Sequence, residues 1–375
     1  MPGLLPHIDP DGLLEYSVVY TDRALNHMAK RFHGVMQDIS RTLKHVYGAQ
    51  SAIVIPGSGT FGMEAVARQF AGGKKVLVVR NGWFSYRWSQ IFEMSGVAGD
   101  ITVLKARRAD GSAKSPFSPA PIEEVVAAIR AGKPDVVFAP HVETSAGMIL
   151  PDSYLSAVAA AVHEHGGLFV LDCVASGAIW VDMAATGVDV IVSAPQKGWS
   201  STPCAGLVML SPHARSVLDN TTSSSFSLDL RKWLAMMESH EQGTNAYHAT
   251  LPTDGLAQLR DVMKETEAFG FEAARAAQQQ LGERIRALLV SKGIHSVAAA
   301  GFQAPGVVVS YTDHADWANT KAFAAQGLQV AAGVPLACDE GPDYRAFRVG
   351  LFGLDKLKNV DRTVASFERA LNALL

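Results

Sequence analysis

One lysine follows a run of apolar residues near the middle of the chain. Lys197 comes directly after VDVIVSAPQ, at residues 188–196. The apolar part of this run is typical of a buried strand, and open α/β sheets bind ligands beyond the carboxyl ends of such strands. An amine held near apolar surface loses its proton more easily, which suits it to Schiff-base chemistry. Most lysines are solvated surface charges, so it is the position of Lys197 that favours a reactive amine.

A glycine-rich segment, GSGTFG at residues 57–62, lies between an apolar run and a helical pattern. Its glycines match the G-x-G-x-x-G pattern of dinucleotide binding. The next predicted strand ends in Arg80 instead of an acid for the ribose, so an NADP-dependent oxidoreductase is a remote alternative. More generally, Ser58, Gly59 and Thr60 offer N–H groups and hydroxyls at a helix N-terminus, where phosphates bind. An ordinary strand-to-helix turn would need the same residues.

Asp172 ends another apolar run, GLFVLD at residues 167–172, where an unpaired carboxylate would be costly. It is either a cap or turn residue or the partner of a cationic heterocycle. A carboxylate at a pyridine nitrogen keeps that nitrogen protonated and makes the ring an electron sink. Lys197 follows 25 residues later, so two adjacent strands would bring both residues to one sheet edge. Acid, amine and phosphate cradle together predict a site for pyridoxal 5'-phosphate.

Strands alternating with helices must position these residues. Apolar runs predict strands at 51–56, 76–79, 101–104, 135–140, 167–172, 188–193 and 205–211, with amphipathic helices at 21–48 and between strands. This alternation predicts an α/β fold with a mostly parallel sheet covered on both faces. A helical pattern from 251 to 290 is broken near Phe269-Gly270. Strands near 294–299, 306–311 and 345–350 and helices at 315–326 and 355–374 follow it.

The bulk composition limits the classes of function. The chain has 375 residues, 48% of them hydrophobic and 18% charged, which is enough for two domains. A net charge of -3 gives no electrostatic footprint for nucleic acid or an anionic membrane. No apolar run reaches transmembrane length, the start does not resemble a secretory signal, and Cys173, Cys204 and Cys338 form no metal or disulfide framework. We therefore expect a soluble cytoplasmic enzyme without a metal.

These motifs, in this order, resemble the class V, fold-type I aminotransferases. The chain is most similar to the alanine–glyoxylate/serine–pyruvate group and to 2-aminoethylphosphonate transaminases, over residues 30–372. The resemblance implies a large domain with a mostly parallel seven-stranded-type sheet plus a smaller C-terminal α/β domain. We place the domain change inside the helical pattern, near 255–275, which gives an N-terminal segment near the active site (1–20), a large cofactor-binding domain (21–260) and a small domain (261–375). The implied reaction is transamination between a small amino acid or aminophosphonate and a 2-oxo acid such as glyoxylate or pyruvate.

The resemblance also gives the predicted residues their roles. Ser58, Gly59 and Thr60 would bind the cofactor phosphate with help from Gln196. In NGWFSYR (81–87), Phe84 would stack on the pyridine, with Trp83 as a near competitor. In HVETSAG (141–147), the Thr144 hydroxyl would bond the phenolic oxygen. Asp172 would hold the pyridine nitrogen, Val174 would pack on the ring, and Lys197 would form the internal aldimine.

Two further segments lie outside the main sheet. GTNAYHATLP (243–252) resembles the segment that crosses a dimer interface, so Tyr247 and Thr250 would reach the phosphate of the partner subunit in a homodimer. Without the resemblance, a polar loop before a helix would explain these residues. Arg348, in FRVGLFG (347–353), resembles the arginine that holds the substrate carboxylate, and its guanidinium matches a carboxylate with two hydrogen bonds. A structural ion pair is the alternative for Arg348.

Two segments depart from the family pattern. Residues 15–33 replace the usual N-terminal substrate loop, and residues 335–345 form a longer loop before the carboxylate-binding strand. Both would line the substrate side, so the amino donor does not transfer from the family. Cys338 in the second segment keeps a lyase or desulfurase of the same fold as an alternative, although an ordinary thiol is the simpler interpretation.

Overall fold

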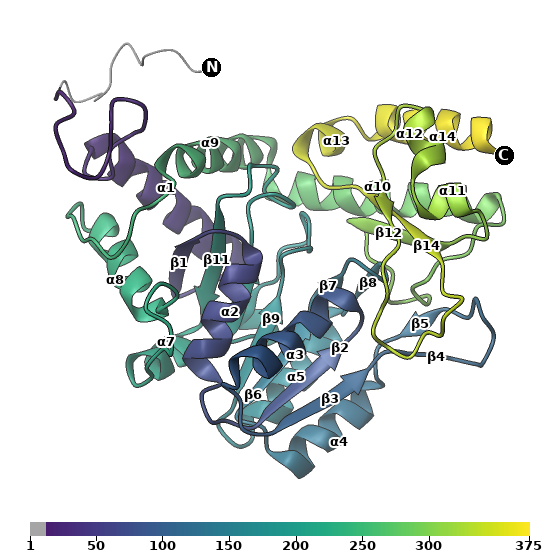
Figure 1. The fold of residues 1–375 in the computed structure, drawn as a ribbon, viewed down its shortest axis with the longest axis horizontal. Coiled ribbons are helices and arrows are strands. Elements are labelled where there is room, and N and C mark those ends of the chain that lie inside the picture. The colour runs from purple at the N-terminus through teal and green to yellow at the C-terminus, as the bar shows by residue number, and fades with distance from the viewer. Residues whose placement is uncertain (1–12) are drawn as a thin grey trace.

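A seven-stranded sheet forms the centre of the larger part of the molecule, in the order β1-β11-β10-β9-β6-β2-β3 (Figure 1). The computed structural model describes residues 13–375. The strands are β1 (Ser51–Pro56), β2 (Val76–Arg80), β3 (Ile101–Lys105), β6 (Val136–Pro140), β9 (Leu168–Asp172), β10 (Val190–Ser193) and β11 (Ala205–Leu210). In this sheet β11 runs antiparallel to β1 and β10, and the other pairings are parallel. The mostly parallel α/β sheet expected from the sequence is therefore confirmed.

Helices between the strands form a layer on each face of this sheet. Right-handed crossovers put α2 (Gly59–Phe70) and α3 (Trp83–Ser95) on one face, because both connections run in the same direction along the strand order. The connections through α4 (Ile122–Gly132), α5 (Asp152–His163) and α6 (Met183–Thr186) run in the opposite direction, so these helices lie on the other face. Buried strands explain the unbroken apolar runs in the sequence.

The helix expected at 21–48 is shorter than its apolar pattern. Helix α1 spans Lys30–Tyr47, whereas residues 21–29 form turns. The cause is a set of side chains that bond the local backbone instead of continuing a helix. The Asn26 side chain accepts a hydrogen bond from the Met28 amide at 2.8 Å, and Asp254 accepts one from the Leu25 amide at 3.3 Å. Helix α1 packs against α8 (Leu230–Glu241) and α9 (Thr253–Phe269).

A three-stranded antiparallel sheet, β12-β14-β13, lies in the C-terminal part of the chain. Its strands are β12 (Val307–Tyr311), β13 (Ala331–Ala332) and β14 (Ala346–Gly350), and the helix that precedes them is α10 (Phe271–Ser291). The strand expected near 294–299 is wrong, because this segment makes only isolated bridges such as Ser296 to Ser310. The helix expected at 315–326 is two short helices, α11 (Ala315–Ala318) and α12 (Lys321–Ala325), separated by Thr320 at a φ of 71°. The last helix is similarly divided into α13 (Leu354–Lys358) and α14 (Val360–Leu374).

The break predicted near Phe269-Gly270 separates α9 from α10. Helix α9 packs against α1, whereas α10 packs against α13 and α14 (Figure 1). The boundary that we propose between residues 260 and 261 lies inside α9, and the first twelve residues of the proposed N-terminal segment lie outside the described residues. Within residues 13–375, no helix combines the length and apolar character that crossing a membrane requires.

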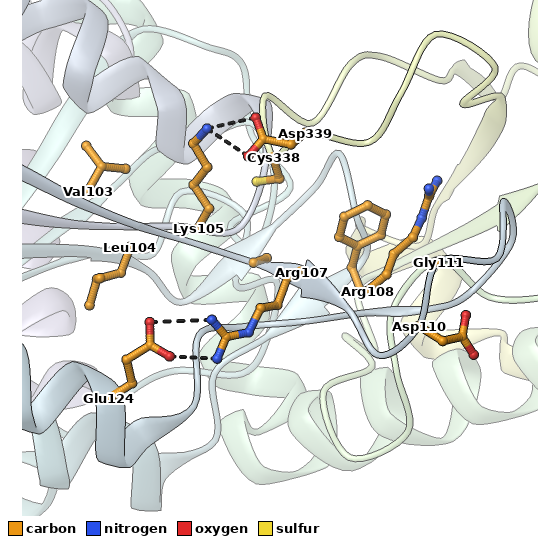
Figure 2. A pocket seen from close by; sticks show the side chains of 12 residues that line it. Val103, Leu104, Lys105, Arg107, Arg108, Asp110, Gly111, Glu124, Cys338 and Asp339 are labelled. Carbon is orange, nitrogen blue, oxygen red and sulfur yellow. Dashed lines mark hydrogen bonds and ion pairs between the residues drawn. The ribbon is translucent and has the colours of Figure 1, made fainter.

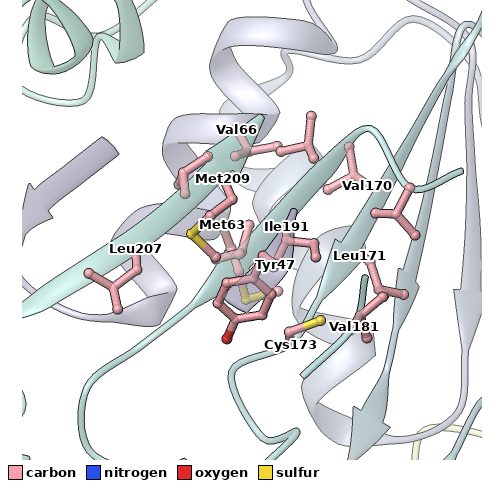
Figure 3. Close-up of a cluster of buried hydrophobic side chains, with 14 of the residues drawn as sticks. Tyr47, Met63, Val66, Val170, Leu171, Cys173, Val181, Ile191, Leu207 and Met209 are labelled. Atoms are coloured by element: carbon pink, nitrogen blue, oxygen red, sulfur yellow. The ribbon is translucent and has the colours of Figure 1, made fainter. Parts of the chain in front are cut away.

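Two clusters of buried apolar side chains support the two sheets. The main cluster fills the large sheet and its helices and continues into α10, β12, β14 and α14 of the C-terminal part. Figure 3 shows the part of it in which Tyr47, Met63 and Cys173 lie close together. The second cluster joins residues of both parts of the chain, among them Phe117, Val142, Met148, Val307 and Leu336. It includes residues of three short strands of the larger part, β5 (Phe117–Ser118), β7 (Val142–Glu143) and β8 (Met148–Ile149).

Candidate active site

Five strands of the large sheet end at the same edge and deliver most of the predicted residues there. Ser58 follows β1, Phe84 follows β2, Thr144 follows β6, Asp172 ends β9 and Lys197 follows β10. They line a cavity of about 150 Å³ whose predicted members are Ser58, Gly59, Thr60, Phe84, Thr144, Asp172, Val174, Gln196 and Lys197. The carboxyl edge of a parallel sheet is where α/β proteins bind ligands, so this cavity is our candidate active site.

Asp172 lies at the centre of this edge. Strand β9 is paired on one side with β6, at Pro140, and on the other with β10, at Val192. The Asp172 side chain is buried, and its Oδ1 accepts a hydrogen bond from the Val174 amide at 2.9 Å. Burial raises the pKa of this carboxyl to about 6. The carboxylate is thus held at a cost that a cationic ligand group would offset.

Lys197 follows β10, the strand that is adjacent and parallel to β9, so its amine reaches the same edge of the sheet as Asp172. Burial lowers the pKa of the Lys197 amine, and the positive charge of Arg348 lowers it further, whereas Asp172 acts in the opposite direction. The Lys197 Nζ lies 5.3 Å from the centre of the Phe352 ring. An amine with a lowered pKa is neutral more often at ordinary pH, and only the neutral amine is a nucleophile.

The predicted phosphate cradle is the N-terminus of α2. Ser58 precedes the helix and Gly59 is its first residue, so the first backbone N–H groups of α2 are free of helical partners. A side chain at Gly59 would not fit, because a Cβ there would lie 2.6 Å from Cγ2 of Val174. The helix start is therefore pressed against the segment that carries Asp172, and the missing side chain leaves the backbone accessible from the cavity.

Glu143 is a buried carboxylate that sequence reasoning missed. It accepts hydrogen bonds from the amides of Phe84 at 3.2 Å and Ser85 at 2.8 Å, and from the Ser85 hydroxyl at 2.7 Å. It also accepts bonds from the amide and hydroxyl of Ser145 at 3.1 and 2.7 Å. Glu143 thus caps α3 from the β6 loop and fixes Phe84 beside Thr144. Its place next to Thr144 in HVETSAG was the available signal.

The choice between the two candidate stacking rings favours Phe84. Phe84 lines the cavity. Trp83 bonds through its amide to the Ser145 hydroxyl at 2.9 Å, and its ring packs 5.6 Å from that of Tyr86. Arg87 also lines the cavity and was missed, although it lies in the same NGWFSYR segment, three residues after Phe84.

Arg348, Tyr247 and Thr250 are not among the residues that line the cavity. Arg348 lies on β14, and its Nε donates a hydrogen bond to the Ala332 carbonyl at 2.8 Å. Its guanidinium is 5.7 Å from the centre of the Phe84 ring, which brings it to the rim of the site. Tyr247 is 58% exposed, and its hydroxyl is 3.3 Å from that of Thr250.

The two unusual segments take different places in the fold. Residues 15–33 do not line the cavity; they lie beside the 247–254 segment, where the Tyr20 hydroxyl donates to the Leu251 carbonyl and the His27 ring lies 5.7 Å from that of Tyr247. In the 335–345 segment, Glu340 accepts hydrogen bonds from the amides of Leu336, Ala337 and Cys338. Its Cys338 is buried, and burial raises the pKa of that thiol to about 12.

A larger cavity of about 530 Å³ lies between β3 and the 335–345 segment (Figure 2). Four of its charged side chains form two ion pairs: Lys105 Nζ lies 2.9 Å from Asp339, and Arg107 lies 2.6 Å from Glu124 (Figure 2). Exposed pairs of this kind contribute little energy, and this cavity contains neither Asp172 nor Lys197. Chemistry is therefore better placed in the smaller cavity.

The comparison with known families agrees with this geometry. The model of the family described as Aminotransferase class-V matches residues 13–345. The chain belongs to the class V aminotransferases. The chain is therefore an aminotransferase, and members of this family are in general pyridoxal-phosphate-dependent.

Individual relatives cover most of this aminotransferase. It is 30% identical to 2-aminoethylphosphonate–pyruvate transaminase 2 of Paraburkholderia xenovorans, over 94% of the chain and 90% of that protein. It is 26% identical to the alanine–glyoxylate aminotransferase of Callithrix jacchus, over 92% and 82%. The structure of alanine–glyoxylate aminotransferase from Nostoc sp. superposes with a TM-score of 0.77 at 22% identity, over 93% and 89%. These matches establish the fold-type I architecture and leave the substrates open.

Proposed function

We propose that the protein transfers an amino group from a small amino acid or aminophosphonate to a 2-oxo acid such as glyoxylate or pyruvate. The observation that supports this most directly is the pairing of Asp172 and Lys197 at the ends of two adjacent parallel strands, in a cavity bounded by a helix N-terminus. A carboxylate, an amine and an anion cradle are the groups that pyridoxal 5'-phosphate needs.

The donor set of the cavity fits this cofactor. Asp172 would hold the pyridine nitrogen, and its burial cost would be offset by that positive charge. The start of α2, with Ser58, Gly59, Thr60 and Gln196, would hold the phosphate. Phe84 and Val174 would enclose the ring plane, and the hydroxyl of Thr144 would face the phenolic oxygen. When bound, the cofactor supplies an aldehyde and an electron sink for the bond next to the substrate nitrogen.

Lys197 would bind the cofactor and, once released, act on the substrate. Its lowered pKa would keep the Nζ neutral, so that it could take a proton from the substrate α-carbon and later give that proton up. Asp172 would hold the pyridine nitrogen as a carboxylate, and Arg348 would orient the acidic end of the substrate with its guanidinium. A phosphonate would fit the same guanidinium, which is why both classes of donor belong to the proposal.

Two alternatives have less support. A desulfurase needs a reactive thiolate, but Cys338 is buried and its pKa is raised to about 12. A dinucleotide oxidoreductase would use Arg80 for the ribose phosphate. Instead, the Arg80 guanidinium is buried and donates to the Ser89 hydroxyl at 2.7 Å and to the Ala337 carbonyl at 3.4 Å.

The proposal includes a homodimer. Tyr247 and Thr250 lie outside the cavity with their hydroxyls near the surface, so they would serve the site of a second subunit in a homodimer. Sedimentation equilibrium of the full chain checks this proposal, since a monomer at micromolar concentration would contradict it.

A donor panel tests the reaction. Aminoethylphosphonate, alanine and serine are each mixed with the cofactor-loaded protein, and visible absorbance is followed before and after glyoxylate or pyruvate is added. A transaminase converts its cofactor with the donor alone and recovers it only after the oxo acid is added. Lys197→Ala should lower turnover about 1,000-fold or more, and Lys105→Ala, outside the site, is the control. Full turnover in Lys197→Ala, or absorbance changes that ignore the oxo acid, would contradict the proposal.

A further inference from the structure

Arg87 is a cavity-lining cation that has no role in the proposed reaction so far. It lies on α3, one helical turn after Phe84, so the two side chains share one face of the helix. Its Nη1 donates a hydrogen bond to the Thr60 hydroxyl at 2.9 Å, and its guanidinium carbon is 5.3 Å from the centre of the Phe84 ring. Arg87 therefore connects the start of α2 to the stacking ring.

The charge of Arg87 acts on the centre of the site. It lowers the pKa of the Asp172 carboxyl and that of the Lys197 amine, as a nearby positive charge does. Within residues 13–375, no carboxylate lies at ion-pair distance from Arg87. By contrast Arg68, on the same layer of helices, is paired with Glu64 at 2.7 Å. The guanidinium thus presents positive charge to the cavity with a neutral hydroxyl as its bonded neighbour.

We propose that Arg87 binds the phosphate group of the cofactor and makes the site selective for phosphorylated over unphosphorylated pyridoxal. The inference rests on the proposed function. A guanidinium and a helix N-terminus bind the same kind of ligand, a phosphate oxygen, and here both converge on Thr60. The guanidinium can place two N–H groups on a phosphate while its plane stays against Phe84.

The position of Thr60, the hydroxyl partner of Arg87, favours a phosphate-binding role for Arg87 over a substrate-binding role. Thr60 belongs to the first turn of α2, which is the proposed cradle. Arg348 comes from the other part of the chain and reaches the Phe84 ring from β14. The two arginines therefore have different tasks: Arg87 holds the cofactor phosphate, and Arg348 takes the acidic end of the substrate.

The test compares two ligands that differ only in the phosphate. Cofactor-free wild-type protein, Arg87→Gln and Arg87→Lys are titrated with pyridoxal phosphate and with pyridoxal, and binding is read from visible absorbance. Arg87→Gln should weaken the phosphate ester about 10- to 100-fold, which is the effect of losing a hydrogen bond to a charged group, and change pyridoxal less than about 3-fold. Arg87→Lys should recover part of the loss, because it retains the charge without the planar fork. Arg68→Gln is the matched control and should change neither ligand.

Inorganic phosphate gives a second measurement that does not depend on the ring. It should compete with pyridoxal phosphate for wild-type protein and compete less well for Arg87→Gln. An equal loss of both pyridoxal ligands, or an unchanged affinity for the phosphate ester with a raised donor KM, would overturn the role of Arg87. If wild-type protein gave no chromophore with pyridoxal phosphate, the proposed function would fail first and this inference with it. Far-UV circular dichroism of each variant shows that the compared proteins are folded.

Discussion

The Glu143 carboxylate accepts a hydrogen bond from the backbone amide of Phe84, so a residue after β6 determines where the first turn of α3 begins. Glu143 is completely buried and takes four further hydrogen bonds from Ser85 and Ser145. A buried carboxylate is tolerated only with such compensation. The ring proposed to stack on the cofactor is thus positioned by a carboxylate that lies outside the cavity lining.

Glu143→Gln should therefore lower the stability of the fold and weaken binding at the site. A glutamine amide turns two donors toward the amides of Phe84, Ser85 and Ser145, and only one oxygen remains to accept from them. We expect a loss of about 1–3 kcal/mol in the free energy of unfolding, measured with urea, and weaker binding of pyridoxal phosphate. Glu124→Gln breaks an exposed pair with Arg107 and should cost less than about 1 kcal/mol. Equal stability of the two variants would contradict the proposed capping role.

Asp172→Asn should have opposite effects on cofactor-free and cofactor-loaded protein. Burial raises the pKa of Asp172 from 3.8 to about 6, so its ionisation destabilises the folded cofactor-free protein as pH rises through this range. At pH 8 the cofactor-free variant should be more stable than wild type by up to about 3 kcal/mol, with the gap closing below the unfolded pKa. Asparagine keeps an oxygen for the Val174 amide.

With pyridoxal phosphate bound, the sign should reverse, because the carboxylate then has its cationic partner. We expect Asp172→Asn to bind the cofactor at least about 10-fold more weakly. Thermal unfolding at several pH values, with and without the cofactor, measures both effects. A variant that is less stable than wild type without cofactor at pH 8 would show that burial does not dominate at Asp172.

Much of the fold followed from the sequence because the strands of its large sheet, except the edge strand β3, are buried. Such strands are continuous apolar runs, and each predicted strand of the large sheet lies within two residues of the observed one. The strand predicted at 294–299 is not formed, because a few apolar residues can pair with the sheet edge at single positions without forming a ladder. The helix predicted over 21–29 is absent for another reason. The Leu25 amide there bonds to Asp254, a residue far along the chain.

The site was predictable where chemistry coincides with the end of a strand, as at Asp172 and Lys197. The positions of Arg87 and Glu143 in the site were not predictable, because they depend on contacts between segments that are far apart in the sequence. Glu143 bonds residues 58 and 59 positions earlier, and no local pattern marks that contact. The proposed role of Tyr247 and Thr250 depends on a second subunit, which one sequence does not describe.

Gly59→Ala should lower the free energy of unfolding because of a steric clash, and Val174→Ala should relieve part of that clash. Its Cβ would lie 2.6 Å from Val174 Cγ2, so we expect a loss of about 1–3 kcal/mol. Adding Val174→Ala removes that methyl group, and the double variant should lose about 1 kcal/mol less than the sum of the single changes. Urea unfolding of the four proteins measures this coupling. Strict additivity would mean that the start of α2 moves aside freely.

Arg348→Lys should separate substrate binding from chemistry. A lysine keeps the charge but loses the planar fork that suits a carboxylate, so KM for the oxo acid should rise about 10-fold or more while kcat changes less. Arg345→Lys, beside a different pocket, serves as the matched control. Steady-state kinetics with glyoxylate and pyruvate provide the measurement. If KM were unchanged while kcat fell, Arg348 would act on the reacting atoms instead of holding the substrate.

The second buried cluster joins the larger and the smaller part of the chain. Phe117, Val142 and Met148 from the larger part share one apolar interior with Val307 and Leu336 from the smaller part. Separating the sheets would expose this interior to water, at a cost that grows with the apolar area uncovered. We therefore expect the chain to unfold as one cooperative unit, so that the proposed substrate-binding arginine of β14 and the proposed cofactor-binding loop of Thr144 are lost together.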